Sequence, residues 1–171
     1  MTTNVLFVCT GNAARSVMGA ALLRAAMPEL LVTSAGTHSI PGLPMSVRTK
    51  GALDAVGVAD LEHRSSQLDA EMADPADLVV IFEPMHITWI RRHLPEIAGR
   101  TASLPYLAAE LAAGPLATLA GRIDALELGD HDFEAWEEVV DPAGGDLPVF
   151  EAAAFAIRDH INALVARLDD R

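Results

Sequence analysis

The stretch that decides the fold is "NVLFVCTGNAARSVM", residues 4–18. It opens with a continuous apolar run over residues 4–8, the pattern of a strand buried on both faces of a parallel sheet. A turn containing Gly11 follows, and residues 16–27 are dominated by Ala, Leu and Met, which favour a helix. The stretch therefore predicts a strand, a tight loop and a helix, with Cys9 where the strand ends.

The rest of the chain repeats this alternation. Strands are predicted at residues 30–36, 77–82 and 100–105, and helices at 44–57, 84–94 and 150–168. Strands that alternate with helices form a parallel sheet with right-handed crossovers. We expect an α/β fold, a three-layer sandwich with a central four-stranded parallel sheet and helices on both faces. Residues 1–171 are predicted to form one domain, with an insertion at about 106–138 that is mostly helix with an acidic loop.

Composition and charge exclude several classes of protein. Hydrophobic residues make up 51% and charged residues 21%, and the net charge is −12 with no basic cluster longer than Arg91-Arg92. Because a nucleic-acid binder needs a basic face, we expect no nucleic-acid partner. No apolar run approaches the roughly 18 residues of a spanning helix, and the N-terminus does not resemble a signal peptide. The single cysteine suits a reducing compartment, so we expect a cytoplasmic protein without a membrane partner.

The residues after the first strand have the chemistry of an anion site. Gly11 and Asn12 allow the backbone to curl until successive N–H groups face inward at the start of a helix. Arg15 adds a planar fork of donors, and Ser16 is placed to donate a hydrogen bond to the Cys9 sulfur. These residue types predict a thiolate positioned for in-line attack on a phosphoryl group. The alternative is a small buried cysteine without catalytic function.

The first stretch also closely resembles the N-terminal signature of the low-molecular-weight protein tyrosine phosphatases, in which a strand leads into Cys-x-Gly-Asn-x-x-Arg-Ser. Four later segments resemble that family in the same order: "TSAGT" (33–37), "HRSSQL" (63–68), "DLVVIFEPMHITWI" (77–90) and "DPAGGDLPVF" (141–150). The resemblance covers most of the chain except about 106–138. It implies a cysteine-dependent phosphomonoester hydrolase with a cysteinyl-phosphate intermediate, no cofactor and no metal. Its substrate would be a phosphorylated protein or small phosphomonoester, with phosphate or a similar oxyanion in the loop.

The resemblance also implies roles for individual residues. Cys9 is the expected nucleophile, Arg15 stabilises the transferring group, and Asp141 is the general acid. The expected substrate-binding residues are Thr10, Gly11, Asn12, Ala13, Ala14, Ser16 and Ile40. The six histidines have no metal-ligand spacing, and we interpret them as surface or structural residues.

Three departures from the family pattern concern the substrate. A second loop cysteine of the family corresponds here to Ala14, an aromatic wall corresponds to Ile40, and tyrosines after the Asp-Pro correspond to Ala143 and Gly144. A phosphotyrosine ring would therefore lose flat apolar partners on both sides. The sequence predicts phosphomonoester chemistry and leaves the preference for phosphotyrosine open.

Two alternative functions stay open at this point. Arsenate reductases form a related branch on the same fold, and "AWEEVVDPAGG" (135–145) resembles them. With no further cysteine, such a reductase would need an external small thiol. "MHITWI" (85–90) favours the phosphatase. A non-catalytic oxyanion-binding protein is the third possibility, but binding alone requires neither the thiol of Cys9 nor the acid of Asp141.

Overall fold

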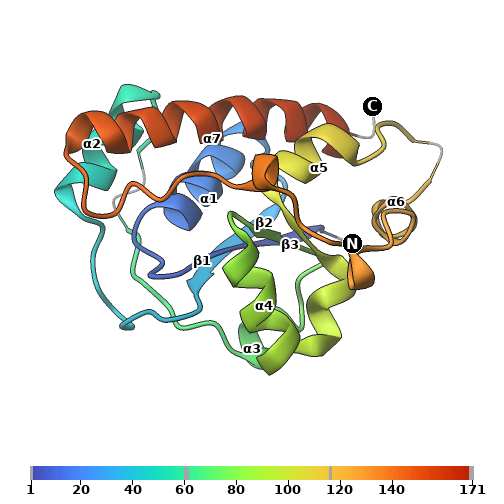
Figure 1. The fold of residues 1–171 in the computed structure, drawn as a ribbon. Coiled ribbons are helices and arrows are strands. Elements are labelled where there is room, and N and C mark those ends of the chain that lie inside the picture. Colours follow the sequence, from blue (N-terminus) through green and yellow to red (C-terminus); the bar gives the residue numbers. More distant parts are fainter. Residues whose placement is uncertain (1, 60–61, 116, 170–171) are drawn as a thin grey trace.

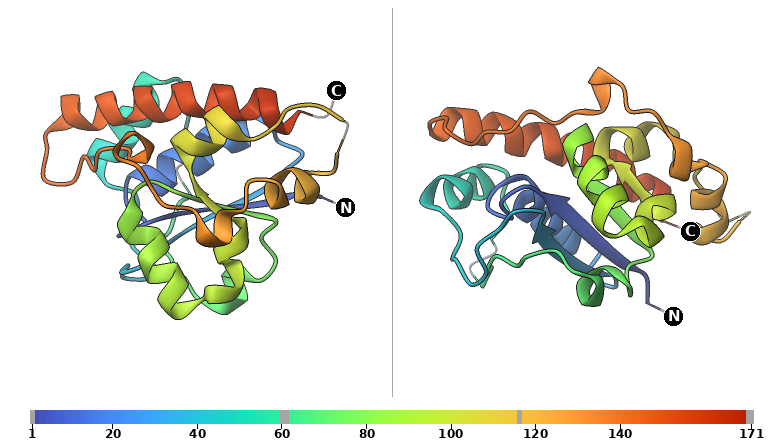
Figure 2. Two further views of the ribbon diagram at one scale, coloured as in Figure 1. Left: turned by 45° about the vertical axis from the view of Figure 1, so that its right-hand side comes forward. Right: turned by 60° about the horizontal axis from the view of Figure 1, so that its bottom comes forward.

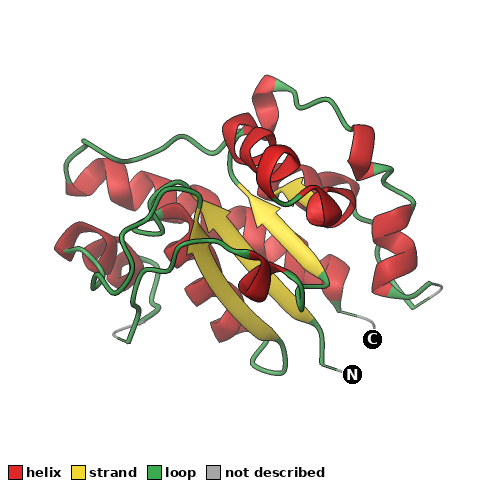
Figure 3. Ribbon diagram, turned by 90° about the horizontal axis from the view of Figure 1, so that it is seen from below, coloured by secondary structure: helices red, strands yellow, loops and turns green. Residues whose placement is uncertain are grey.

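The computed structural model describes residues 2–59, 62–115 and 117–169. Among these residues, four strands form one parallel sheet in the order β2-β1-β3-β4 (Figures 1 and 3). The strands are β1 (Asn4–Cys9), β2 (Leu31–Gly36), β3 (Leu78–Ile81) and β4 (Thr101–Ser103). The α-helices are α1 (Arg15–Ala26), α2 (Val47–Ala55), α3 (Ala70–Ala73), α4 (Pro84–His93), α5 (Leu104–Glu110), α6 (Leu119–Asp124) and α7 (Leu147–Leu168). Short 3-10 helices are η1 (Pro95–Arg100), η2 (Leu128–Asp130) and η3 (Ala135–Glu137).

The two faces of β1 build two separate cores. Val5 and Phe7 point into one apolar cluster, and Leu6 and Val8 point into the other, because successive side chains of a strand alternate between faces. Helices α1, α2, α5 and α7 contribute to the first cluster, and α4 and η1 contribute to the second. Figure 1 shows the same arrangement, with α7 and α1 above the sheet and α4 below it. The predicted three-layer sandwich is confirmed.

The strand order determines where a ligand can bind. β1 lies between β2 and β3, so the chain moves to one side after β1 and crosses back after β2. In open parallel sheets, ligands bind beyond the carboxyl ends of the strands at such a reversal. Cys9 ends β1, and Glu83 follows shortly after β3. The reversal therefore brings these two residues to the same edge of the sheet.

Two helices begin at other residues than the sequence pattern predicted, each directly after a residue whose side chain caps it. α7 starts at Leu147, three residues before the predicted start, because the Asp146 side chain caps its first turn. α2 starts at Val47 because Ser46 caps it in the same way. Pro44, the predicted start of that helix, instead lies in an isolated antiparallel bridge.

The segment 106–138 is less helical than predicted. Its helical residues are the end of α5, the short α6, and the 3-10 helices η2 and η3, with irregular backbone between them. Gly114-Pro115 explains the interruption between α5 and α6, since this sequence favours a turn. Ile123 and Leu128 are buried and anchor the segment to the core under α7. In the part of the chain that the structure describes, no helix is long and apolar enough to cross a membrane.

The segment then returns across the molecule as an extended strap, residues 138–146. Figures 1 and 2 show this strap, in orange, running beside α7 toward the N-terminal end of that helix. The backbone N–H of Val139 donates to the carbonyl of Phe82, 2.8 Å away, just beyond β3. The strap thus reaches the same edge of the sheet as Cys9.

Candidate active site

The Cys9 loop, residues 9–16, curls around Asn12. This residue has a left-handed backbone (φ 51°) and is fully buried. Its side-chain Nδ2 donates to the hydroxyls of Ser16 and Ser34, each 2.9 Å away, and its Oδ1 accepts from the backbone N–H of Ser66 at 2.8 Å. The ring of His63 contacts the Asn12 carbonyl at 3.0 Å. One asparagine therefore ties the loop to α1, to β2 and to the segment before α3.

Ser16 is oriented toward the Cys9 sulfur. The Ser66 N–H fixes the Asn12 amide so that Nδ2 donates to the Ser16 hydroxyl oxygen. The Ser16 hydroxyl proton is then available to Cys9 Sγ, which lies 2.9 Å from Ser16 Oγ. Cys9 itself is only 3% exposed. The hydrogen bond would stabilise a thiolate at this position.

The loop backbone presents unpaired donors. The N–H groups of residues 11–14 donate to no other described residue, and α1 starts without a side-chain cap or an acidic residue in its first turn. These N–H groups and the helix N-terminus together favour an anion. The loop also packs against Gly36 at the end of β2, where a Cβ would lie 2.5 Å from the carbonyl oxygen of Thr10. Only glycine at position 36 permits this close approach.

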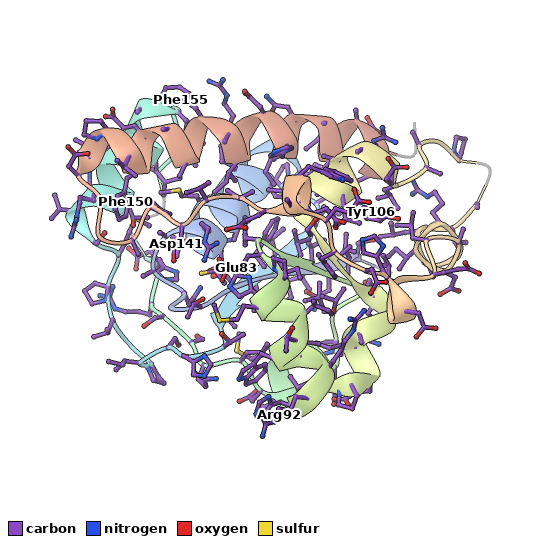
Figure 4. The ribbon with its side chains drawn as sticks, viewed as in Figure 1. Glu83, Arg92, Tyr106, Asp141, Phe150 and Phe155 are labelled. Atoms are coloured by element: carbon purple, nitrogen blue, oxygen red, sulfur yellow. The ribbon has the colours of Figure 1, made fainter. Side chains whose placement is uncertain are left out.

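Arg15 is held by carboxylates from two sides. Its side chain is 2% exposed, and its Nη1 donates to Glu83 at 2.6 Å and to the Val139 carbonyl at 3.0 Å. Its Nη2 lies 3.2 Å from an Asp141 carboxylate oxygen. Figure 4 shows Glu83 at the start of α4 and Asp141 on the strap, the two elements from which these carboxylates reach Arg15. The sequence predicted a guanidinium suited to phosphate oxygens, and the structure adds that Glu83 and the strap orient it.

These groups surround one small pocket of about 90 Å³. It is lined by Cys9, Thr10, Gly11, Ala13, Ala14, Arg15, Asp141 and Ala143. Residues from the first loop and from a strap more than 120 positions later thus meet at one place. None of the lining residues is aromatic.

Three expected site residues lie outside that lining. Asn12 and Ser16 are fully buried behind it and act on the loop itself. Ile40 is 68% exposed on the segment after β2, and its backbone carbonyl accepts a hydrogen bond from the Ser65 hydroxyl at 2.5 Å. Ile40 is not among the residues that line the pocket.

Asp141 sits at the open side of the pocket. Its side chain is 42% exposed, and its second carboxylate oxygen accepts from the backbone N–H of Ala143 at 3.0 Å. A carboxyl group at the mouth of the pocket can exchange protons with solvent and reach a leaving group. The same carboxyl group thus pairs with Arg15 and is open to solvent.

Sequence reasoning missed two residues that support the loop, Glu83 and His86. His86 is fully buried, and its Nε2 lies 3.1 Å from the Thr10 hydroxyl oxygen while its Nδ1 accepts from the Phe82 N–H at 3.3 Å. Burial and, to a smaller extent, the positive charge of Arg15 lower the pKa of His86 to about 3. Glu83 and His86 directly follow a predicted buried strand. This position could have indicated a role in the site, because ligand sites gather at the carboxyl ends of strands.

The described residues also bear on metal binding. Within 2–59, 62–115 and 117–169, no group of three or more His, Cys, Asp or Glu side chains is arranged to hold a metal ion. His131 is instead paired with the buried Glu137 at 2.9 Å, beneath Tyr106. This cluster anchors the chain just before the strap.

Comparisons with known proteins agree with the geometry. The profile of the family described as "Low molecular weight phosphotyrosine protein phosphatase" matches residues 4–109. A protein-arginine-phosphatase of Geobacillus stearothermophilus is 33% identical over 172 residues, which cover 100% of this chain and 97% of that protein. AmsI of Erwinia amylovora, a probable low molecular weight protein-tyrosine-phosphatase, is 35% identical over 101 residues, or 59% of this chain and 70% of that protein. The solved structure of the YwlE arginine phosphatase of Geobacillus stearothermophilus has a TM-score of 0.77 and 31% identity, covering 97% of this chain and 92% of that one.

Proposed function

Since the chain belongs to the low molecular weight phosphotyrosine protein phosphatase family and is a cysteine-dependent phosphatase, we propose that it dephosphorylates protein side chains through a cysteinyl-phosphate on Cys9. One observation carries the proposal. Cys9, Arg15 and Asp141 line a single pocket of about 90 Å³, a size that suits a phosphoryl group. Each of the three has the chemistry that one step of the reaction needs.

In the first step, the Cys9 thiolate attacks phosphorus opposite the leaving group. The S–P bond forms as the bond from phosphorus to the leaving atom breaks. The N–H groups of residues 11–14, which donate to no other described residue, and the Arg15 guanidinium stabilise the charge on the phosphoryl oxygens. Glu83 keeps the guanidinium in place while this happens. Asp141, in its protonated form, gives its proton to the departing group.

In the second step, the Asp141 carboxylate removes a proton from water, and the oxygen attacks phosphorus. The S–P bond breaks, inorganic phosphate leaves, and the Cys9 thiolate is restored with Ser16 as its hydrogen-bond donor. The partial exposure of Asp141 supports this step, because water must reach it.

Phosphotyrosine is the substrate class suggested by the family description, and phosphoarginine is a second candidate. The second is favoured by two observations: the full-length match to a relative named a protein-arginine-phosphatase, and the absence of aromatic residues from the pocket lining. Small walls at Ala13 and Ala143 offer no flat partner for a tyrosine ring. They leave room for an unbranched side chain.

The decisive experiment measures metal-free hydrolysis of p-nitrophenyl phosphate by wild type and by Cys9→Ser. We expect the variant to lose at least about 10⁴-fold in kcat, since the nucleophile is removed. Substrate class is then tested with one peptide carrying phosphotyrosine or phosphoarginine at the same position. Equal turnover by wild type and Cys9→Ser, or none by wild type, would contradict the proposal. Reduction of arsenate with an external thiol, in a protein without phosphatase activity, would support the reductase instead.

A further inference from the structure

We propose that His86 is a positioning residue that directs the Thr10 hydroxyl proton into the catalytic pocket, where Thr10 donates it to an oxygen of the bound phosphoryl group. The inference rests on the proposed function, because it concerns the same pocket. It adds a side-chain hydroxyl to a loop whose other donors toward a bound phosphoryl group are backbone N–H groups and one guanidinium.

The hydrogen bonds determine which ring nitrogen of His86 carries the proton. The backbone N–H of Phe82 can only donate, so Nδ1 of His86, 3.3 Å away, must be the unprotonated nitrogen. In a neutral ring the proton then lies on Nε2. Nε2 is 3.1 Å from Thr10 Oγ1 and therefore donates to it. A carboxylate oxygen of Glu83 is farther from Nε2, at 3.8 Å.

The environment of His86 keeps its ring neutral near neutral pH. His86 is fully buried, and the Arg15 guanidinium adds a positive charge nearby. Both factors disfavour a second ring proton, and together they lower the pKa of His86 to about 3. His86 is thus a fixed donor toward Thr10 and does not exchange protons with the substrate.

Thr10 must then use its own proton elsewhere. Its oxygen already accepts from His86, and among the described residues its hydroxyl has no other hydrogen-bond partner. Thr10 lines the catalytic pocket beside Cys9. The Cys9 sulfur already accepts a hydrogen bond from the Ser16 hydroxyl, 2.9 Å away. When a phosphoryl group occupies this pocket, its oxygens are acceptors placed to receive the Thr10 proton.

Two variants of Thr10 test the donor. Affinity for inorganic phosphate is measured by titration calorimetry, and kcat and KM are measured with p-nitrophenyl phosphate. Thr10→Val, which is nearly the same size, should bind phosphate about tenfold more weakly, the effect of losing one hydrogen bond to a charged group. Thr10→Ser keeps a hydroxyl and should remain within about threefold of wild type. Equal phosphate affinity for the Val and Ser variants would overturn the proposal.

Two variants of His86 separate positioning from folding. His86→Asn places an acceptor near the former Nδ1 and keeps the Phe82 contact, but it cannot reach Thr10. His86→Gln places an amide N–H near the former Nε2 and keeps the Thr10 contact at the expense of Phe82. A positioning role predicts that the Gln variant binds phosphate more tightly than the Asn variant, whatever their order in thermal unfolding. The opposite order in phosphate affinity would overturn it.

A double variant provides the final test. If His86 acts through Thr10, His86→Asn should weaken phosphate binding in the wild-type background and cause less than a twofold change in the Thr10→Val background. Additive losses would show that His86 affects the fold only, and would overturn the inference. Calorimetry with phosphate does not require turnover, so the result is independent of the phosphatase assay. Failure of the proposed function would appear separately, as absent hydrolysis by wild type.

Discussion

The Cys9 loop and the strap form two sides of the same pocket, but the protein holds them in different ways. Asn12 in the loop is fully buried and makes side-chain hydrogen bonds to Ser16 within the loop, to Ser34 of β2 and to Ser66 before α3. Asp141 on the strap has a side chain that is 42% exposed. Apart from the anchor at Val139, the strap contacts the loop region through Arg15 alone among the described hydrogen bonds and ion pairs.

This difference matches the two tasks of the pocket. Stabilising a transition state requires donors fixed in advance, because reorganising them during the reaction would cost free energy. A proton donor must instead meet a variable leaving group and then water, which favours an exposed residue on a less constrained segment. Substitutions in the Cys9 loop and in the strap should therefore impair activity and stability in different ways.

The largest effect is expected from Arg15, where loop and strap meet. Arg15→Lys keeps the charge but cannot reach Glu83, the Val139 carbonyl and Asp141 together. We expect kcat/KM for p-nitrophenyl phosphate to fall by about 10²- to 10³-fold. Arg92→Lys, on the exposed face of α4 (Figure 4), is the matched control. Activity within a few-fold of wild type would contradict the role of Arg15.

The next effect isolates the strap. Asp141→Asn should slow hydrolysis of an alkyl phosphate by about 10²-fold, because its poor leaving group needs the proton. An aryl phosphate with a good leaving group should be slowed far less. Glu138→Gln removes an exposed charge from the same strap and is the control. Equal slowing of both substrates by Asp141→Asn would point to another acid.

A stability comparison separates the two regions without an activity assay. Asn12 and Gly144 both have a positive φ, 51° and 84°. Asn12→Ala strains the backbone and leaves buried hydroxyl and N–H groups without their partner, so we expect a loss of about 2–3 kcal/mol in the free energy of unfolding. Gly144→Ala on the strap meets no atom within 4 Å and should cost about 1 kcal/mol from the backbone alone. Urea denaturation measures both. Equal losses would mean that the strap is as tightly held as the loop.

The smallest effect depends on pH. The pKa of His86 is lowered to about 3 in the folded protein. As the pH falls, the imidazole therefore becomes protonated in the unfolded chain before it does so in the folded protein. The stability this neutral ring contributes is fully present above about pH 6.5 and is lost as the pH falls toward 3. The stability difference between wild type and His86→Asn should therefore narrow by about 2 kcal/mol from pH 7.5 to pH 5. His93→Asn, at the exposed end of the same helix, is the control. A constant difference for His86→Asn would contradict the expectation.

Much of the fold could be predicted because the signals are local. The apolar run of residues 4–8 and the helix-forming residues after it correspond to β1 and α1. Helix starts were less predictable, since Asp146 and Ser46 act as caps through hydrogen bonds that apolar periodicity does not indicate. Segment 106–138 is less helical than predicted, since irregular backbone separates the end of α5, α6, η2 and η3.

The sequence by itself determined the strand, the anion loop and the thiol at its start, since all of these depend on neighbours within a few residues. It also indicated Asp141 as the acid, through its resemblance to a known family. Only the tertiary structure decided how the site is held. Glu83, His86 and Val139 contact the loop because the reversal of strand order and the return of the strap bring the ends of β1 and β3 and the strap together. Long-range packing sets those contacts, and it also removed Ile40 from the pocket wall.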